Sequence, residues 1–399
     1  MRVLWNNIVS TKVGKKNRLK KKLKNKKLNE NSESMTKVTI DPWGSFLVKN
    51  YEEIVGQYGL EPFTDELLAK IPESNKLMRR KIVFAHTDFG RVLDAIVNKK
   101  DFYVLTGIMP TMDKIHLGTK LVIENVKYFQ ERGAKTYVLV ADLEAAATRS
   151  VSLEEGRKRA LDFHIPAYIA LGLDPKKTVF YFQSTNEKVK NLAFIFSNKI
   201  TLNEYRAIYG NTEPARMMSS ILQAGDILFP QLERKMPGVI PVGPDQSVHV
   251  LLSRDIVNRT KTTFNFVPPS GIYNKFTPSL DGEMKMSKSK PQSCISIPDN
   301  VDEACKKIRR ALSGARKTLE DHRKYGAIPE NDMSFQLLKQ HFIEDDKELK
   351  RIYDEYKAGR MMTGEIKDIT CEKLTEFMKD FEKKLEKAKK IVPKLNFIQ

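Results

Sequence analysis

Four short, continuous apolar runs constrain the fold of this chain more than any other feature of its sequence. Runs of four to six apolar residues are typical of strands buried on both faces of a sheet. Helical patterns cover 116–132 and 153–171 between them, and Ser152 with Glu155 predicts a capping box at the start of the second. Strands that alternate with helices predict a parallel sheet and an α/β fold. The four runs are 102–106 (FYVLT), 136–141 (TYVLVA), 179–182 (VFYF) and 239–242 (VIPV).

In a parallel α/β sheet, ligands bind beyond the carboxyl ends of the strands. The segments that follow the first, second and fourth runs should therefore hold the functional residues. These segments are 107–119, 142–144 and 243–246.

The strand pattern ends near residue 300. Beyond it, apolar residues recur at steps of three or four with Lys and Glu between them, which predicts an amphipathic helix. These residues are Leu374, Phe377, Phe381, Leu385 and Ala388. We therefore expect residues 301–399 to form a separate, all-helical unit.

Composition limits the class of protein. No apolar run approaches the roughly 20 residues that span a bilayer, so an integral membrane protein is excluded. The chain has three cysteines and no C-x-x-C pair, which indicates a reducing compartment, and we expect a cytoplasmic protein. No metal centre is expected in the protein itself, because no pair of histidines has the spacing of metal ligands.

Positive charge is concentrated near the start of the chain. The sequence holds 69 Lys+Arg against 50 Asp+Glu, a net charge of +19, and residues 1–34 contain eleven basic and two acidic residues. The basic block 15–27 should be disordered alone, because like charges repel and apolar matter is scarce. It could be a tail that contacts RNA phosphates. It could also be an accessory or misannotated extension, because Met35 could begin the protein.

The first motif, PTMDKIHLGT at 110–119, directly follows the first apolar run. Gly118 at the opening of a helix lets a ligand approach the backbone closely. The helix N-terminus supplies free N–H groups and positive potential for phosphate, and His116 could donate to a phosphate oxygen. An ordinary strand–turn–helix with a chance histidine is the alternative.

The second motif is KMSKS at 285–289. Two lysines three residues apart, separated by small hydroxyl residues, suit a mobile loop that clamps a triphosphate. A solvated loop is the alternative, but a chance match to this five-residue pattern is rare in a chain of this length.

The third motif is IPVGPDQ at 240–246, at the end of the fourth run. Gly243 would allow close approach of an adenosine. Asp245 can accept from a ribose hydroxyl, and Gln246 can pair with a polar substrate head. This motif is weak alone, whereas the first two motifs together form a strong pair.

Taken together, these motifs resemble those of the class I aminoacyl-tRNA synthetases. HLGT at 116–119 resembles the HIGH motif, and KMSKS is intact. The chain is most similar to the tryptophanyl and tyrosyl pair, and several segments resemble the tryptophanyl enzymes of archaea and eukaryotes in particular. These segments are 41–44 (DPWG), 84–95 (FAHTDFGRVLDA), 242–256 (VGPDQSVHVLLSRDI), 314–326 (GARKTLEDHRKYG) and 356–368 (YKAGRMMTGEIKD).

The resemblance implies a domain organisation. A basic tail (1–34) and an N-terminal appendage (35–80) would precede a Rossmann-type, parallel-sheet catalytic domain (81–300). An insertion near 185–215 would form the interface of a homodimer. The helical end (301–399) would bind the anticodon of tRNA(Trp), and residues such as Phe377 or Tyr356 could stack on its bases if they are exposed.

The resemblance also implies roles for particular residues. Catalysis would depend on His116, Thr119, Lys285 and Lys288. ATP, with Mg²⁺, would be bound by Gly107, Gly118, Gly243, Asp245, Met286, Ser287 and Ser289. L-tryptophan would be bound by Leu105, Glu144, Gln223, Asp226 and Gln246.

The sequence departs from the family at four positions, one of which is Met112 in the turn, where glycine is common. Thr119 stands where the HIGH motif usually has its second histidine. Leu105 and Leu139 stand where eukaryotic-type tryptophanyl enzymes have a Tyr and a Gln, so recognition of the indole must come from elsewhere.

Asp226 occupies the position that resembles the aspartate of bacterial tryptophanyl enzymes. An indole N–H only donates, so one buried carboxylate satisfies it. A phenol also needs a second partner, which the apolar Leu105 cannot supply, and an unpaired buried polar group costs about 1–3 kcal/mol. The pocket therefore favours tryptophan over tyrosine. Asp226 could instead cap a helix or face water.

The expected reaction has two steps. The tryptophan carboxylate attacks the α-phosphorus of ATP, and the acyl group then passes to the terminal ribose of the tRNA. Catalysis would be mainly positioning and charge stabilisation, completed by closure of the KMSKS loop. The alternatives are a tyrosyl enzyme, a non-catalytic RNA-binding paralogue and a generic nucleotidyltransferase.

Overall fold

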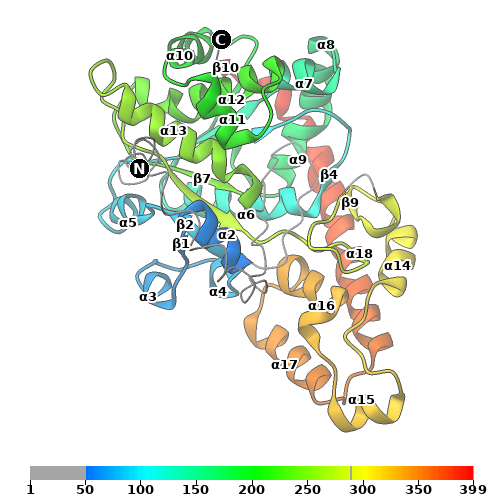
Figure 1. The fold of residues 1–399 in the computed structure, drawn as a ribbon. Helices are drawn as coiled ribbons and strands as arrows, with labels where there is room; N and C mark the ends of the chain where they lie inside the picture. The colour runs from blue at the N-terminus through cyan, green and yellow to red at the C-terminus, as the bar shows by residue number, and fades with distance from the viewer. Residues whose placement is uncertain (1–50, 288–289, 399) are drawn as a thin grey trace, which may run out of the picture. The chain divides into compact units, whose positions relative to one another are not determined.

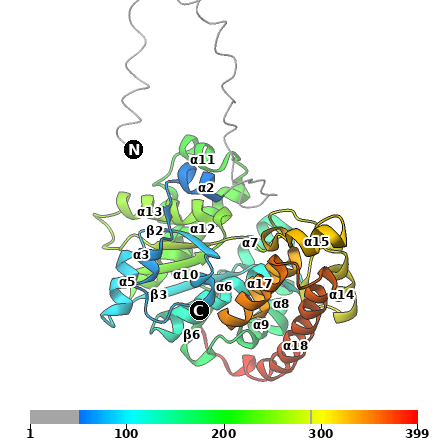
Figure 2. The ribbon, with the colours of Figure 1, turned by 90° about the horizontal axis from the view of Figure 1, so that it is seen from below.

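The computed structural model describes residues 51–287 and 290–398, and these residues form an eight-stranded sheet with helices around it (Figures 1 and 2). The strand order is β1-β2-β8-β7-β3-β5-β6-β10. The six strands from β8 to β10 are mutually parallel, whereas β2 runs antiparallel to β8 and β1 antiparallel to β2. The strands are β1 (Glu61–Pro62), β2 (Val83–Thr87), β3 (Tyr103–Ile108), β5 (Lys135–Val140), β6 (Thr178–Phe182), β7 (Gly238–Val242), β8 (Ser270–Asn274) and β10 (Phe397–Ile398).

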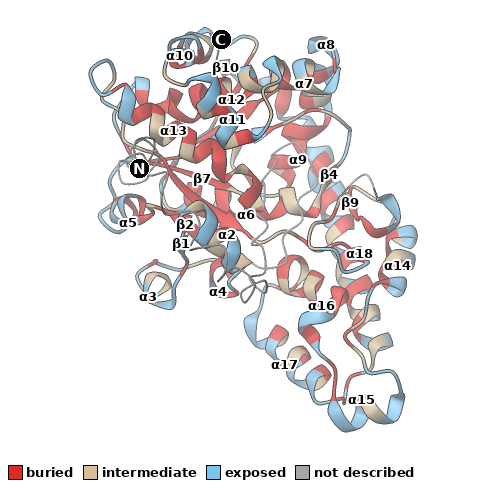
Figure 3. Cartoon of the chain, viewed as in Figure 1, coloured by how far each residue is buried: buried red, intermediate tan, exposed pale blue. Residues whose placement is uncertain are grey.

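The four predicted strands are the adjacent central strands β7, β3, β5 and β6. Their side chains alternate between two apolar cores, one on each face of the sheet, which is why the runs are continuous rather than alternating. One core takes Val104, Val138 and Phe180, and the other takes Tyr103, Tyr137 and Tyr181. The predicted α/β class with a parallel sheet is confirmed. Figure 3 shows the strands among the buried parts of the chain.

Helices cover both faces of the sheet. Residues of α5, α6 and α9 enter one core, and residues of α10 to α13 enter the other. The helices up to residue 259 are α2 (Tyr51–Tyr58), α3 (Asp65–Leu68), α4 (Lys76–Arg79), α5 (Gly90–Val97), α6 (Leu117–Glu131), α7 (Asp142–Arg149), α8 (Leu153–Arg159), α9 (Ile165–Ala170), α10 (Glu187–Ser197), α11 (Leu202–Tyr209), α12 (Pro214–Leu228) and α13 (Ser247–Arg259).

The predicted helix at 153–171 consists of α8 and α9 joined by a π-helical turn, η1 (Ala160–His164). Ser152 caps it, because its Oγ accepts from the Glu155 N–H at 3.1 Å. The Glu155 carboxylate bonds to Arg159 on the next turn instead of returning to the cap. Only half of the predicted capping box is therefore present.

The chain beyond residue 300 is helical up to its last described residues. Four of the five apolar positions predicted on its long helix are buried, and Phe377 is half-buried. The helices are α14 (Val301–Arg310), α15 (Leu319–Tyr325), α16 (Met333–Leu337), the π-helical η7 (Leu338–Phe342), α17 (Asp346–Lys357) and α18 (Thr363–Lys389). After α18, β10 pairs with β6 in the central sheet, an extension that the sequence did not predict.

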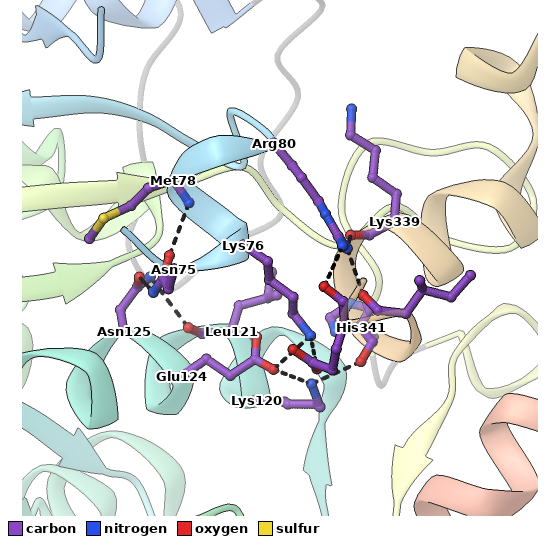
Figure 4. A network of polar contacts seen from close by, with 12 residues as sticks. Asn75, Lys76, Met78, Arg80, Lys120, Leu121, Glu124, Asn125, Lys339 and His341 are labelled. Atoms are coloured by element: carbon purple, nitrogen blue, oxygen red, sulfur yellow. Dashed lines mark hydrogen bonds and ion pairs between the residues drawn. The ribbon is translucent and has the colours of Figure 1, made fainter. Parts of the chain in front are cut away.

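A buried polar cluster joins α4, α6 and the chain after η7 (Figure 4). Lys120 of α6 donates to Glu124 Oε1 at 2.5 Å and to the His341 carbonyl at 3.0 Å. Lys76 of α4 lies 3.1 Å from the same Glu124 oxygen. Arg80 donates to the carbonyl of Lys339, within η7, and to the carbonyls of Ile343 and Glu344, which directly follow η7. Each cation thus has a carboxylate or carbonyl partner, as burial requires.

The same turn reaches the segment that leads into the KMSKS loop. The His341 Nε2 and Thr277 Oγ1 atoms are 3.0 Å apart, and the Thr277 carbonyl accepts from the Met286 N–H at 2.8 Å. Burial and the nearby lysines hold the pKa of His341 well below its usual range, so this histidine is neutral. The helical end of the chain therefore contacts α6 just after the first motif, and it contacts Thr277, whose carbonyl bonds to Met286 of the second motif.

In residues 51–287 and 290–398, no helix is long and apolar enough to cross a membrane.

Candidate active site

A cavity of about 360 Å³ lies at the carboxyl ends of β3, β5 and β7. A ligand is expected at this place, because the chain leaves β3 toward β5 on one side and later returns to β7 on its other side. Ligands of parallel α/β sheets bind beyond the carboxyl ends of the strands at such a point. Thirteen of the predicted site residues line it: Leu105, Gly107, His116, Gly118, Thr119, Glu144, Gln223, Asp226, Gly243, Asp245, Gln246, Lys285 and Met286. Ser287 lines an adjoining hollow together with His116 and Thr119. Lys288 and Ser289 lie outside the described residues.

The first two motifs are joined by a short two-stranded sheet. β4 (Ile115–His116) pairs antiparallel with β9 (Ser296–Ile297), and His116 is opposite Ser296. β9 follows the KMSKS loop by only a few residues, so this pairing holds both motifs against one cavity. The pairing joins residues about 180 apart in the chain and has no local sequence signal.

His116 is the N-cap of α6, and the first turn of this 15-residue helix faces the cavity through Gly118 and Thr119. A Cβ atom on Gly118 would lie within 2.9 Å of the His116 ring. The glycine is therefore needed to accommodate the imidazole as well as an approaching ligand. The free N–H groups of the helix start favour an anion here.

Lys285 is paired with the third motif in this structure. Its Nζ lies 2.9 Å from Asp245 Oδ2 and 4.9 Å from the centre of the Phe276 ring. Asp245 is the residue expected to bind the ribose, and it follows β7 on a turn that begins at Gly243. To contact the phosphates of a nucleotide, the Lys285 ammonium group must therefore leave the Asp245 carboxylate and bind the phosphate oxygens instead.

Asp226 is fully buried on α12, and the cavity reaches it. Its Oδ1 accepts from the Tyr181 hydroxyl at 3.1 Å, and its Oδ2 accepts from Gln183 Nε2 at 2.6 Å. Burial raises the pKa of Asp226 to about 8; the two hydrogen bonds oppose this rise, and the charges of Glu144 and Asp142 add to it. Asp226 therefore neither faces water nor bonds to the end of its own helix.

The polar end of the cavity is formed by Glu144 and Gln223. Glu144 lies in the first turn of α7, directly after β5, and its Oε2 accepts from Gln223 Nε2 at 2.8 Å. Gln223 and Asp226 are three residues apart on α12, which places them on one face of the helix. Leu105 and Leu139 line the cavity, so these two positions, which depart from the family, form an apolar wall.

Sequence reasoning missed Tyr181 and Gln183, which hold Asp226. Gln183 directly follows the third apolar run, and a polar residue at the carboxyl end of a buried strand was the available signal. It also missed that His249 lines the cavity, where its Nδ1 lies 3.0 Å from the Tyr209 hydroxyl. Burial lowers the pKa of His249 to about 3, so the ring is neutral.

Comparisons with known proteins agree with this geometry. A family model described as tRNA synthetases class I (W and Y) matches residues 97–379. A tryptophan–tRNA ligase from Methanocaldococcus jannaschii is 41% identical over 369 residues, which covers 90% of this chain and 99% of the relative. One from Aeropyrum pernix is 41% identical over 364 residues, covering 89% and 97%.

Solved structures are similar as well. The tryptophanyl-tRNA synthetase of Aeropyrum pernix K1 superimposes with a TM-score of 0.81 at 41% identity, covering 89% of this chain and 98% of that one. The Encephalitozoon cuniculi enzyme, solved with bound tryptophan, gives a TM-score of 0.79 at 26% identity, covering 88% and 98%. The chain therefore belongs to the class I tRNA synthetases of tryptophan and tyrosine, and within them to the tryptophan–tRNA ligases.

Proposed function

We propose that this protein activates L-tryptophan with ATP and transfers the tryptophanyl group to tRNA(Trp) in the cytoplasm. One observation carries the proposal: the start of α6, Lys285 and the fully buried acceptor Asp226 face a single cavity. The relatives are tryptophan–tRNA ligases, which supports tryptophan over the tyrosine alternative.

The amino acid would lie between the apolar wall and α12. Asp226 would accept from the indole N–H, while Leu105 and Leu139 contact the ring. Glu144 would take the ammonium group, and Gln223 with Gln246 would hold the carboxylate. The distance between the two ends of the substrate would then be fixed by the spacing of Gln223 and Asp226 on one helix.

ATP would lie across the start of α6 and the end of β7. Gly243 and Asp245 would contact the adenosine, and His116, Thr119 and the helix N-terminus would contact the phosphates. Mg²⁺ would enter with ATP as part of the substrate. Lys285, with Lys288 from outside the described residues, would reach the phosphates when the loop closes.

The first step needs no protein nucleophile. A carboxylate oxygen of tryptophan bonds to the α-phosphorus, the bond from that phosphorus to the bridging oxygen breaks, and pyrophosphate leaves. Negative charge grows on the leaving pyrophosphate, so the chain's contribution is alignment of the two substrates and fixed positive charge.

The helices beyond residue 300 would bind the tRNA. Tyr356 cannot stack on a base, because it is fully buried and its hydroxyl donates to Asp332 at 2.7 Å. Phe377 is half-buried between two other phenylalanine rings. Tyr325, at the end of α15, is 58% exposed beside Arg323 and Lys324, and it is the better candidate for stacking.

One assay separates the candidate functions. Pyrophosphate exchange should depend on tryptophan and remain at background with tyrosine, and tRNA charging should show the same preference. Exchange driven by tyrosine would establish the tyrosyl alternative. RNA binding without exchange by either amino acid would establish a non-catalytic paralogue.

We also propose a homodimer that forms through the region of α10 to α12. Large apolar side chains are exposed there, most of all Phe194, which is 79% exposed, and Met218, which is 54% exposed. Exposed apolar side chains that gather in one region are typical of protein interaction surfaces, and large patches of them are rare on monomeric proteins. Phe194→Glu should therefore convert the dimer to monomer in sedimentation velocity, because it would bury a charge.

The matched control is Leu319→Glu, at a residue of α15 that is 57% exposed. It should leave the sedimentation coefficient unchanged. A wild-type monomer, or a Phe194→Glu protein that remains dimeric, would contradict this interface.

The raised pKa of Asp226 predicts a pH dependence of binding. Below about pH 8 the carboxyl holds a proton, and an N–H donor favours the ionised form, so tryptophan binding should release the proton. The affinity for tryptophan should rise by up to about tenfold from pH 7 to 8.5 and then level off. Tyr181, Glu144 and Asp142 are the other titratable groups that act on this carboxyl.

The reference ligand is 3-benzothienylalanine, in which sulfur replaces the indole N–H. Both ligands are titrated by calorimetry at each pH, and the ratio of their affinities is compared. The ionisation of the α-amino group, which both ligands share, divides out of this ratio. A ratio of affinities that does not change with pH would contradict the assignment of Asp226.

A further inference from the structure

We propose that Gln183 is a positioning residue that determines recognition of the indole N–H, acting through Asp226. This inference rests on the proposed function, and it concerns a residue that is fully buried behind the cavity.

Gln183 is held in place by the sheet. It directly follows β6, and its own N–H donates to the Val140 carbonyl at 3.0 Å, which continues the pairing with β5. Its side-chain amide therefore starts from a fixed point at the carboxyl edge. The two ends of that amide then contact two different parts of the predicted tryptophan site.

The donor end contacts Asp226. Gln183 Nε2 lies 2.6 Å from Asp226 Oδ2, and the Tyr181 hydroxyl lies 3.1 Å from Oδ1. Residues two apart on a strand project from the same face, so both donors approach the carboxyl from the sheet. They fix the plane of the carboxyl group and leave its remaining lone pairs for the substrate.

The acceptor end contacts the first turn of α7, at the polar end of the cavity. Gln183 Oε1 accepts from the Glu144 N–H at 3.4 Å, and the Glu144 carboxylate in turn accepts from Gln223. One amide thus spans from the residue predicted to read the indole to the residue predicted to bind the ammonium group.

The chemistry of Asp226 makes the donor end decisive. Burial favours the neutral carboxyl, which is a weaker acceptor than a carboxylate, and a hydrogen bond from Gln183 favours the ionised form. Apolar replacement of Gln183 removes this bond and leaves Asp226 free to rotate or to retain its proton. Recognition of the N–H should then weaken, while packing of the ring against Leu105 and Leu139 should persist.

The test compares two substrates that differ at one atom. Pyrophosphate exchange is measured with tryptophan and with 3-benzothienylalanine for the wild type, Gln183→Met and Gln183→Asn. Methionine keeps the length without a donor, and asparagine keeps an amide that is too short for both contacts. Each variant should lower kcat/KM for tryptophan about tenfold or more and change that for the analogue less than about threefold.

The matched control is Gln130→Met. Gln130 is also a buried glutamine, on α6, and its Nε2 donates to Thr178 at the opposite end of β6, away from the cavity lining. This variant should change both substrates by the same factor. Equal losses for both substrates in the Gln183 variants would make Gln183 merely structural and overturn the inference. Gln183 variants that keep the wild-type kcat/KM for tryptophan would overturn it as well. Absence of tryptophan-dependent exchange in the wild type would instead reject the proposed function.

Discussion

Lys285→Ala is expected to slow tryptophan-dependent pyrophosphate exchange by about 10²- to 10³-fold, which is the usual cost of removing one preorganised contact to charge in a transition state. In this structure Lys285 is paired with Asp245, and a lysine on a flexible stem can follow charge as it moves to the leaving pyrophosphate. Because the contact is made mainly in the transition state, kcat should fall more than KM for ATP rises.

The matched control is Lys290→Ala, five residues further along the chain. Lys290 is half-exposed and pairs with Glu283, and it does not line the cavity. Exchange by this variant should stay within about twofold of the wild type, since exposed ion pairs contribute little. A Lys285→Ala protein that exchanges at a normal rate would show that Lys285 does not act on the phosphates.

Asp226→Asn is expected to lower kcat/KM for tryptophan by about 10- to 100-fold, because one or more buried donors lose their acceptor. The carboxylate offers about four lone-pair sites to Tyr181, Gln183 and the indole N–H, whereas an asparagine has one acceptor oxygen and two donor hydrogens. The amide nitrogen must therefore face at least one donor. Steady-state exchange at varied tryptophan concentration measures the effect.

Asp255→Asn serves as the control for loss of a partly buried carboxyl. Asp255 lies on α13, outside the lining of the cavity, and burial raises its pKa too. Exchange by this variant should stay close to wild type. If Asp226→Asn retains full activity while its thermal unfolding is normal, the indole must be read by another group.

The central strands could be predicted because each is buried on both faces, which leaves a continuous apolar run in the sequence. β2 and β8 could not, because His86, Thr87, Ser270 and Asn274 interrupt the apolar pattern of VFAHT and SGIYN. β10 has only two residues, and its place beside β6 depends on tertiary packing after a long helix. The local sequence pattern therefore does not indicate that the chain comes back to the sheet after α18.

The candidate site was predictable where chemistry is local to a motif. The helix start at His116 and the lysine at 285 could be identified from their neighbours in the sequence. The Tyr181–Asp226–Gln183 arrangement could not, because it requires α12 to pack over the end of β6. Gly225 permits the close approach of α12 to the neighbouring helix α10, since a Cβ there would lie 2.9 Å from the Val189 carbonyl.

The buried cluster around Lys120 bears on the exchange of parts between relatives. Arg80 and Lys76 precede the central strands, yet they bond to residues between 339 and 344, and Lys120 bonds there from α6. A chimera that imports only the helical half from another enzyme would leave these cations facing foreign carbonyls and carboxylates. A graft should therefore move the segment 76–80 together with the chain beyond residue 300. It should also keep Lys120 and Glu124 of α6 compatible with these two segments.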